Sequence, residues 1–289
     1  MEKLIIGVWQ GRCEDGNLEA NLVRTEQVID EAAEAGCDFV CLPELFLSGG
    51  DKAEYQIRGA IALDDLRLAS LAEHAGRREV VTIVGLCEKR GRSHAVTAAV
   101  LAGGKVAGHY TKTMLTRGDR EVMADFDDEL PVFQAKGVCF GVMICHDSSF
   151  PEVAATLAWK GAKILFSPHY NSIAPERMDD HRLLVRNNHI GIAAHYGLVV
   201  ARSNTVGRWE NPERLGYGDS AIFSATGTPL AEAGLFVERL VTADVAPHLG
   251  QQRWRKRSDL RPAIIQQLCA AALAALGPGR RPGQGHPHG

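Results

Sequence analysis

The sequence lacks the features that mark several large classes of protein. Its charges nearly cancel, with a formal net charge of -3 over 289 residues, so it has no electrostatic signature of binding to nucleic acid or to an acidic membrane. No apolar run approaches the roughly 20 residues that a membrane-spanning helix requires. The N-terminal stretch MEKLIIGVWQ lacks the longer hydrophobic region and cleavage site of a signal peptide. We therefore expect neither nucleic-acid nor membrane partners.

Cysteine is present, but not in a pattern that binds a metal or builds a disulfide framework. The seven cysteines form an odd set with no CxxC pair and no Cys/His spacing typical of a metal site. In a chain of this size, such usage favours a reducing, cytoplasmic setting in which most thiols are structural. We expect no metal and no cofactor.

The composition is that of an ordinary globular protein, with 45% hydrophobic and 23% charged residues. Amphipathic periodicity predicts helices over 17–36, roughly 61–77, 151–162 and most of 176–197. Strands are predicted over 4–10, 38–44, 80–89, 136–145, 163–169 and 198–207, and hairpins over 95–112, turning at Gly103-Gly104, and 217–234. Because helices alternate with both single strands and hairpins, we expect an α/β or α+β layered domain with mixed sheets.

The chain shows no internal repeat and no convincing boundary before its last residues. We therefore expect one domain over residues 1–276. The tail over 277–289, GPGRRPGQGHPHG, is rich in glycine and proline, and we expect it to be disordered.

Three predicted strands end abruptly in a polar or reactive residue, namely Glu44, Cys145 and His169, and Lys112 follows the first hairpin. The carboxyl ends of neighbouring strands converge on one edge in layered α/β proteins, where sites form. Taken singly, each residue has an ordinary structural explanation, since strand-end cysteines are mostly core and lysines mostly surface. No histidine is placed as a metal ligand or as a base for the thiol.

Together, these segments resemble the carbon–nitrogen hydrolase (nitrilase-like) family, which uses a Glu–Lys–Cys triad. The matches are LPELF around Glu44, YTKTML around Lys112 and GVMICHDSSFPE around Cys145, in the family's chain order. Supporting matches lie at Gln10, Asn21, 186–207, 216–234 and 257–262, so the resemblance covers about 250 positions. It implies an αββα sandwich, with two mixed sheets between outer helices.

The chemistry of the three groups agrees with this resemblance. A cysteine near its reference pKa of about 8.5 is mostly protonated at neutral pH and needs a nearby base. Glu44 is the candidate, because burial raises the pKa of a carboxyl group and a neighbouring lysine lowers it. The Lys112 ammonium, together with the backbone N–H of His146, is expected to stabilise the oxyanion formed when Cys145 attacks an amide-type carbonyl.

The resemblance also implies a second glutamate between the lysine and the cysteine. Glu121 is the best match, and we expect it to orient Lys112 or the substrate amide. Residues that follow the strand ends should line the substrate pocket. The candidates are His146, His169, Tyr170 and Asn171 and, further along, Arg202 and Asn204.

The branch of the family is indicated by His146-Asp147. Nitrile-cleaving members commonly carry Trp-Glu after the cysteine, whereas amidase and carbamoylase members carry an aromatic residue followed by Asp. The acid here favours hydrolysis of a small-molecule amide or N-carbamoyl compound, although the histidine departs from the usual aromatic.

Two alternatives remain open: a nitrile hydrolase with the same triad, and a non-catalytic member of the fold that binds a metabolite or partner. A redox-sensor role for Cys145 is weaker, because no resolving cysteine lies close in sequence.

The resemblance further implies self-association. Members usually assemble through outer helices, so we expect a homodimer or a higher even-numbered homo-oligomer. The helix after Pro151 and the helix at 176–197 are the expected interface elements.

Overall fold

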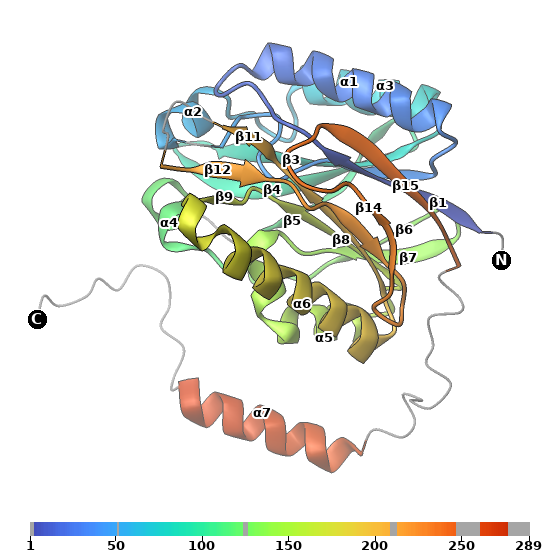
Figure 1. Ribbon diagram of the computed structural model, residues 1–289, viewed down its shortest axis with the longest axis vertical. Helices are drawn as coiled ribbons and strands as arrows, with labels where there is room; N and C mark the ends of the chain where they lie inside the picture. The colour runs from blue at the N-terminus through green and yellow to red at the C-terminus, as the bar shows by residue number, and fades with distance from the viewer. Residues whose placement is uncertain (1–2, 51, 124–126, 209–212, 247–260, 277–289) are drawn as a thin grey trace, which may run out of the picture. The chain divides into compact units, whose positions relative to one another are not determined.

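Two mixed sheets lie face to face between outer helices in this protein (Figure 1). The computed structural model describes residues 3–50, 52–123, 127–208, 213–246 and 261–276. The sandwich belongs to a compact unit that spans Met1–Gly250. The αββα arrangement expected from the sequence is therefore confirmed.

A second unit spans Gln251–Gly289. Its described part contains one helix, α7 (Pro262–Leu276), which carries no charged residue. The tail over 277–289 lies outside the described residues, as does most of the 257–262 segment.

The first sheet has the strand order β15-β1-β2-β3-β4-β5. Its strands are β1 (Leu4–Gln10), β2 (Phe39–Cys41), β3 (Val81–Arg90), β4 (Ser93–Ala102), β5 (Lys105–Thr111) and β15 (Arg239–Val245). Strands β1, β2 and β3 are parallel, and the other pairs are antiparallel. The predicted turn at Gly103-Gly104 is confirmed: both glycines have positive φ and join β4 to β5.

The second sheet has the order β14-β13-β10-β8-β7-β6. Its strands are β6 (Val132–Ala135), β7 (Val138–Val142), β8 (Ile164–His169), β10 (Val199–Asn204), β13 (Ala221–Phe223) and β14 (Pro229–Glu232). Strands β7, β8 and β10 are parallel, so their carboxyl ends share one edge. A small sheet beside this edge joins β9 (Ser172–Ile173), β11 (Val206–Arg208) and β12 (Leu215–Tyr217).

Helices cover the outer face of each sheet (Figure 1). The first sheet is covered by α1 (Leu18–Glu34) and α3 (Leu66–Arg77), and the second by α5 (Pro151–Trp159) and α6 (Met178–Tyr196). Helix α1 begins where the Asn17 side chain accepts a hydrogen bond from the Ala20 N–H (3.2 Å), and α6 ends at Gly197, which has φ 64°. Two short helices, α2 (Ala53–Arg58) and α4 (Arg117–Val122), were not predicted.

Alternation along the strands separates three apolar layers. The layer between the sheets contains the packed rings of Phe39, Phe140 and Phe166, whose centroids lie 5.4–5.6 Å apart. On β8, Phe166 faces this central layer, whereas its neighbour Leu165 faces α6. In the part of the chain that the structure describes, no helix combines the length and apolar character needed to cross a membrane.

Candidate active site

Glu44, Lys112 and Cys145 come from three separate elements and meet where strands of both sheets end. Glu44 follows β2 and Lys112 follows β5, both in the first sheet, while Cys145 follows β7 in the second. The Lys112 Nζ lies 2.7 Å from Glu44 Oε1. The Cys145 thiol lies close enough to the Glu44 carboxylate that the thiol lowers the pKa of Glu44 and the carboxylate raises the pKa of Cys145. Residues far apart in sequence therefore form one contiguous cluster.

Cys145 occupies a sharp bend between β7 and the 3₁₀ turn η1 (Cys145–Ser149). Its φ is 48°, a left-handed conformation that strains a residue with a Cβ atom and that persists only where the surrounding structure enforces it. The side chain is half-buried. Burial and the nearby Glu44 carboxylate raise the pKa of Cys145 well above its usual value, although Lys112 opposes them. The resting thiol is protonated and needs a base to become a nucleophile.

Glu44 is placed to be that base. Its side chain is 3% exposed, and burial raises its pKa above the usual 4.5, with Lys112 opposing the shift. The second oxygen, Oε2, accepts the Tyr170 N–H at 2.9 Å. The Glu44 backbone N–H donates to the His169 carbonyl at 3.3 Å, which ties the end of β2 to the end of β8 across the two sheets.

Lys112 lies between two carboxylates. Its Nζ is 2.7 Å from Glu44 and 2.8 Å from Asp119 Oδ2, and the side chain is 1% exposed. Burial alone disfavours the ammonium, but Glu44 and Asp119 hold the pKa of Lys112 well above its usual value. Asp119 is itself fixed as the third residue of a capping box with Thr116, at the start of α4.

The acid beside Lys112 is Asp119, so the predicted role of Glu121 in orienting Lys112 is wrong. Glu121 is exposed, two residues further along α4. Residues 119 and 121 point to different sides of a helix, so only one of them can face Lys112. A signal for Asp119 was present in the sequence: Thr116 and Asp119 have the spacing of a capping box, which directs the acid back toward the preceding segment.

Asp147 fixes the bend that carries Cys145. This carboxylate is fully buried, and burial raises its pKa while the bonds it accepts oppose the shift. Its oxygens accept four hydrogen bonds, from Tyr110 OH (2.7 Å), the Ile144 N–H (2.7 Å), the Met114 N–H (2.8 Å) and Thr113 Oγ1 (3.2 Å). Three of these donors flank Lys112, so Asp147 attaches the cysteine bend to the lysine segment.

Of the predicted pocket residues, Tyr170 and Asn171 lie beside Cys145. The Tyr170 N–H lies against the cysteine sulfur, and Asn171 Nδ2 is 3.5 Å from Sγ. His146 is half-buried, with its ring edge-on to Phe150 at 5.2 Å between centroids. Burial and the nearby Lys112 lower the pKa of His146, so its ring is neutral at neutral pH.

The His169 side chain lies elsewhere, contrary to prediction. It is on the face of β8 that α6 covers, where its Nε2 contacts Ser167 Oγ at 3.0 Å and His189 Nε2 at 3.2 Å. Strand alternation explains the difference, because residues 165, 167 and 169 share that face. Only the His169 carbonyl reaches the site, through its bond with Glu44.

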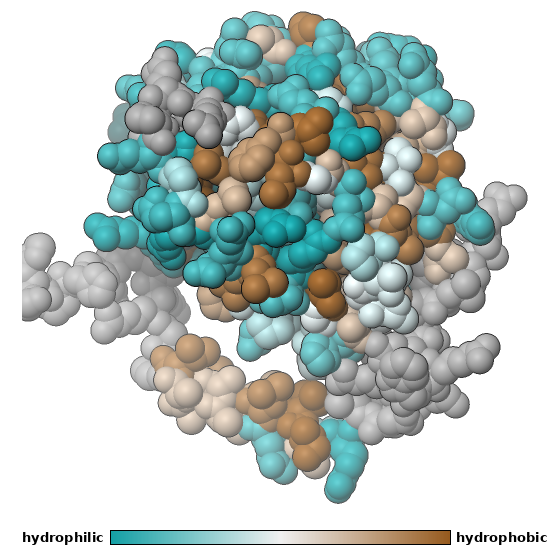
Figure 2. Space-filling view, viewed as in Figure 1, coloured by the Kyte–Doolittle hydropathy of each residue, from teal (hydrophilic) through white to brown (hydrophobic). Residues whose placement is uncertain are grey.

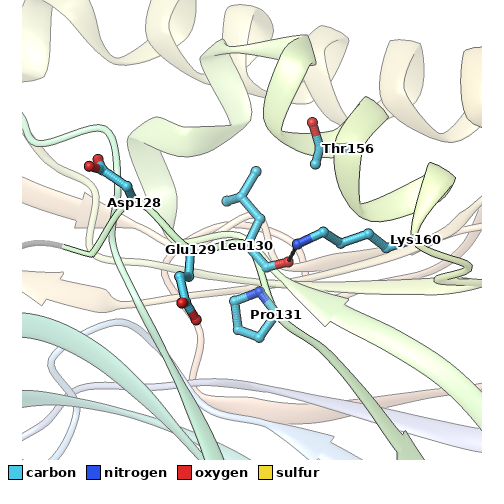
Figure 3. Close-up of a pocket in the computed structure, with 6 residues that line it drawn as sticks. All are labelled: Asp128, Glu129, Leu130, Pro131, Thr156 and Lys160. Carbon is cyan, nitrogen blue, oxygen red and sulfur yellow. Dashed lines mark hydrogen bonds between the residues drawn. The ribbon is translucent and has the colours of Figure 1, made fainter. Parts of the chain in front are cut away.

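A separate surface hollow of about 370 Å³ is shown in Figure 3. It is lined by Asp128, Glu129, Leu130, Pro131, Thr156 and Lys160. Lys160 Nζ donates to the Leu130 carbonyl at 2.8 Å, and none of the six residues belongs to the cluster around Cys145. Among the described residues, no group of three or more His, Cys, Asp or Glu side chains is arranged to hold a metal ion.

The family of the chain follows from sequence similarity over most of its length. The model of the carbon–nitrogen hydrolase family matches residues 5–255. The chain belongs to the carbon–nitrogen hydrolase family. The prediction drawn from its motifs, and the expectation of an enzyme that acts on carbon–nitrogen bonds, are confirmed.

Relatives of this carbon–nitrogen hydrolase include enzymes with different substrates. An N-carbamoylputrescine amidase from Solanum tuberosum is 29% identical over 290 residues, covering 91% of this chain and 94% of the relative. A carbon–nitrogen hydrolase from Helicobacter pylori G27 has a similar fold, with a TM-score of 0.77 at 22% identity, covering 92% of this chain and 99% of the other.

A second solved structure is that of an amidase variant from Nesterenkonia sp. AN1. It has a TM-score of 0.72 at 21% identity, covering 92% of this chain and 97% of the other. In that protein, the acetamide moiety of fluoroacetamide is covalently added at the active-site cysteine.

Proposed function

We propose that this protein hydrolyses the carbon–nitrogen bond of a small-molecule amide or N-carbamoyl compound through a thioester on Cys145. One observation carries the proposal: a single buried carboxylate, Glu44, is 2.7 Å from the Lys112 ammonium and close enough to the Cys145 thiol for each to shift the pKa of the other. A base, a cation and a nucleophile gathered at one place are what acyl transfer from nitrogen requires.

In the first half of the reaction, Glu44 takes the thiol proton as Cys145 attacks the carbonyl carbon. The negative charge that develops on the carbonyl oxygen is stabilised by the Lys112 ammonium and the His146 N–H. Glu44 then gives its proton to the departing nitrogen. The carbon–nitrogen bond breaks, ammonia or an amine leaves, and a thioester remains on Cys145.

In the second half, Glu44 takes a proton from water, and the resulting hydroxide attacks the thioester. The carbon–sulfur bond breaks, the acid is released, and the proton returns to the sulfur. Burial raises the pKa of Glu44 above its usual value, which favours its alternation between proton acceptor and proton donor. Asp119 keeps Lys112 charged and fixed in both halves.

Amides and N-carbamoyl compounds are favoured over nitriles by the acid at position 147. Nitrile hydrolysis with the same triad is the alternative activity, and a non-catalytic binding role is the alternative class. The strained backbone at Cys145 argues against a passive scaffold, because such strain persists only where the surrounding structure enforces it.

The test is a screen for ammonia release with primary amides, ω-amides, N-carbamoyl compounds and nitriles. We expect turnover of at least one amide or N-carbamoyl compound, and none by Cys145→Ser. Cys139→Ser is the matched control, because Cys139 is also half-buried but lies on β7, before the bend; it should keep wild-type turnover. Release of ammonia from nitriles alone would reassign the activity to nitrile hydrolysis. If iodoacetamide alkylated Cys145 no faster than the other six thiols, the non-catalytic binding role would be favoured.

We also propose that the protein is a homodimer or larger even-numbered assembly formed through α5 and α6. Leu183 and Leu184 on α6 are 57% and 59% exposed, and Trp159 at the end of α5 is 38% exposed. Figure 2 looks onto α6 and shows apolar side chains among polar ones over this helix. Large apolar side chains exposed on the outer face of a protein are often part of an interface.

A further inference from the structure

The amide side chain of Asn171 lies between the Cys145 sulfur and a fully buried arginine. Its Nδ2 is 3.5 Å from Cys145 Sγ. On its other side, Oδ1 accepts hydrogen bonds from Arg202 Nη2 at 2.9 Å and from Tyr217 OH at 3.2 Å. Arg202, on β10, is 1% exposed, and Tyr217, on β12, is fully buried.

The chemistry of these donors fixes which way the Asn171 amide points. Arginine has five N–H donors and no acceptor, so an amide NH₂ group facing Arg202 would leave buried donors opposed to one another. The oxygen of Asn171 must therefore face Arg202, and its NH₂ group must face the cysteine sulfur. A flipped amide would present an oxygen to the sulfur, which disfavours the thiolate.

Arg202 is itself held from the far side by Asp219. Its Nη1 donates to the Asp219 carbonyl and lies 3.5 Å from Oδ2 of the same residue. Asp219 also pairs with Arg186 at 2.8 Å and with Arg182 at 3.3 Å, both on α6. A continuous set of contacts thus runs from α6 through Asp219 and Arg202 to Asn171.

We propose that Arg202 is a positioning residue that orients the Asn171 amide so that its N–H groups stabilise the Cys145 thiolate. Asn171 is then the group that touches the reacting atom, and Arg202 acts only through it. This assignment rests on the proposed role of Cys145 as the nucleophile. The other charged groups that face the sulfur are Glu44, Lys112 and Asp119, which none of the variants below alters.

The experiment measures alkylation of Cys145 by iodoacetamide against pH, read by peptide mass spectrometry. Arg202→Lys keeps the positive charge beside Asp219 but cannot also reach Asn171 as the planar guanidinium does. We expect alkylation to slow about tenfold at each pH below the pKa of Cys145, because a hydrogen bond that stabilises the thiolate is lost. The matched control is Arg214→Lys, since Arg214 binds the next residue, Ser172, through its Nε at 2.9 Å; it should leave the profile unchanged.

A double-mutant cycle shows whether Arg202 acts through Asn171. In the Asn171→Ala background, Arg202→Lys should change the alkylation profile less than twofold. If Arg202→Lys folds poorly by circular dichroism, Tyr217→Phe takes its place. It removes the second donor to Asn171 Oδ1, together with the contacts of the Tyr217 hydroxyl with Arg202 Nη2 (3.3 Å) and His181 Nδ1 (3.1 Å). We expect it to slow alkylation about twofold to threefold in the wild-type background alone.

A wild-type profile for Arg202→Lys, or equal effects of Arg202→Lys with and without Asn171, would overturn the proposal. The readout needs no substrate. Failure of the ammonia-release screen would count against the proposed function, whereas the alkylation cycle separately reports the coupling of Arg202, Asn171 and Cys145.

Discussion

At Lys112, two carboxylates share one ammonium in a place almost closed to water. Glu44 interacts with the Cys145 sulfur as well as with the Lys112 ammonium, whereas Asp119 contacts the lysine and the start of α4. In the proposed mechanism, Glu44 becomes neutral whenever it holds a proton. Asp119 is then the anion that keeps Lys112 charged, because a buried ammonium without a partner is costly.

Replacing Asp119 should therefore slow the reaction without unfolding the protein. We expect Asp119→Asn, whose side-chain oxygen still caps α4, to lower kcat by about tenfold or more, since oxyanion stabilisation by Lys112 weakens. The control is Glu121→Gln on the same helix, which should keep kcat within twofold. Steady-state kinetics and thermal melts of both variants check this. Equal losses in the two variants, or a larger loss in Glu121→Gln, would contradict the assignment.

The pH dependence of the reaction should report Glu44. The group acts as a base only when ionised, so kcat/KM should fall as pH falls through its pKa. Because burial raises that pKa above 4.5, the acid limb should lie above pH 4.5. Rates measured over a pH series, with circular dichroism to show that the protein stays folded, check this. An acid limb at or below pH 4.5 would mean that Glu44 is not the base.

Among the elements, the turn η1 depends on one carboxylate. Asp147 binds the backbone N–H of Ile144, just before Cys145, and three groups of the segment around Lys112. The acid that distinguishes the amidase-like motif in the sequence thus has a structural explanation here. It holds the cysteine bend against the lysine segment.

Asp147→Asn should destabilise the protein as well as the site. An amide has one oxygen instead of two, and its NH₂ group would face buried donors. We expect the free energy of unfolding to fall by about 2–4 kcal/mol. Ser149→Ala, at an exposed position of the same turn, is the control and should change it by less than about 0.5 kcal/mol. Urea denaturation measures the free energy of unfolding of both variants. A loss in Asp147→Asn no larger than that in Ser149→Ala would show that the hydrogen bonds to Asp147 do not stabilise the protein.

The sequence predicted the elements with strong periodicity or turn chemistry. The helices at 17–36 and 176–197 and the hairpin at Gly103-Gly104 are confirmed, because amphipathic spacing and glycine turns are local signals. Strands β6, β9, β12 and β15 and helices α2 and α4 were missed. Short helices carry little periodicity, and β15 is defined by its pairing with β1, more than 200 residues away, which no local pattern encodes.

On the scale of the whole molecule, the site exists only when the two sheets stack. Glu44 and Lys112 come from one sheet, and Cys145 and Asn171 come from the other. The sequence identified the first three by their motifs. It led to Glu121 in place of Asp119, because the capping-box spacing of Thr116 and Asp119 was not used. It could not show that His169 faces α6, because that depends on the direction of a single side chain in the folded protein.

Self-association is the prediction that belongs to this scale. Changing both Leu183 and Leu184 to Glu should reduce the mass in solution from at least twice that of the 31.3 kDa chain to that of one chain, because charge would replace apolar surface on α6. Leu66→Glu is the control, since Leu66 is 85% exposed on α3, on the other outer face. Light scattering after size-exclusion chromatography measures the masses. A monomeric wild-type protein, or an unchanged assembly in the α6 variant, would contradict the prediction.

The most direct test of the central claim is the capture of the acyl enzyme. The protein is mixed with an amide or N-carbamoyl substrate found in the screen, quenched in acid during turnover, digested and analysed by mass spectrometry. We predict an added acyl mass on the peptide that contains Cys145, absent from Cys145→Ala, which should not turn over. Turnover by Cys145→Ala, or an acyl group on a different residue, would contradict the account.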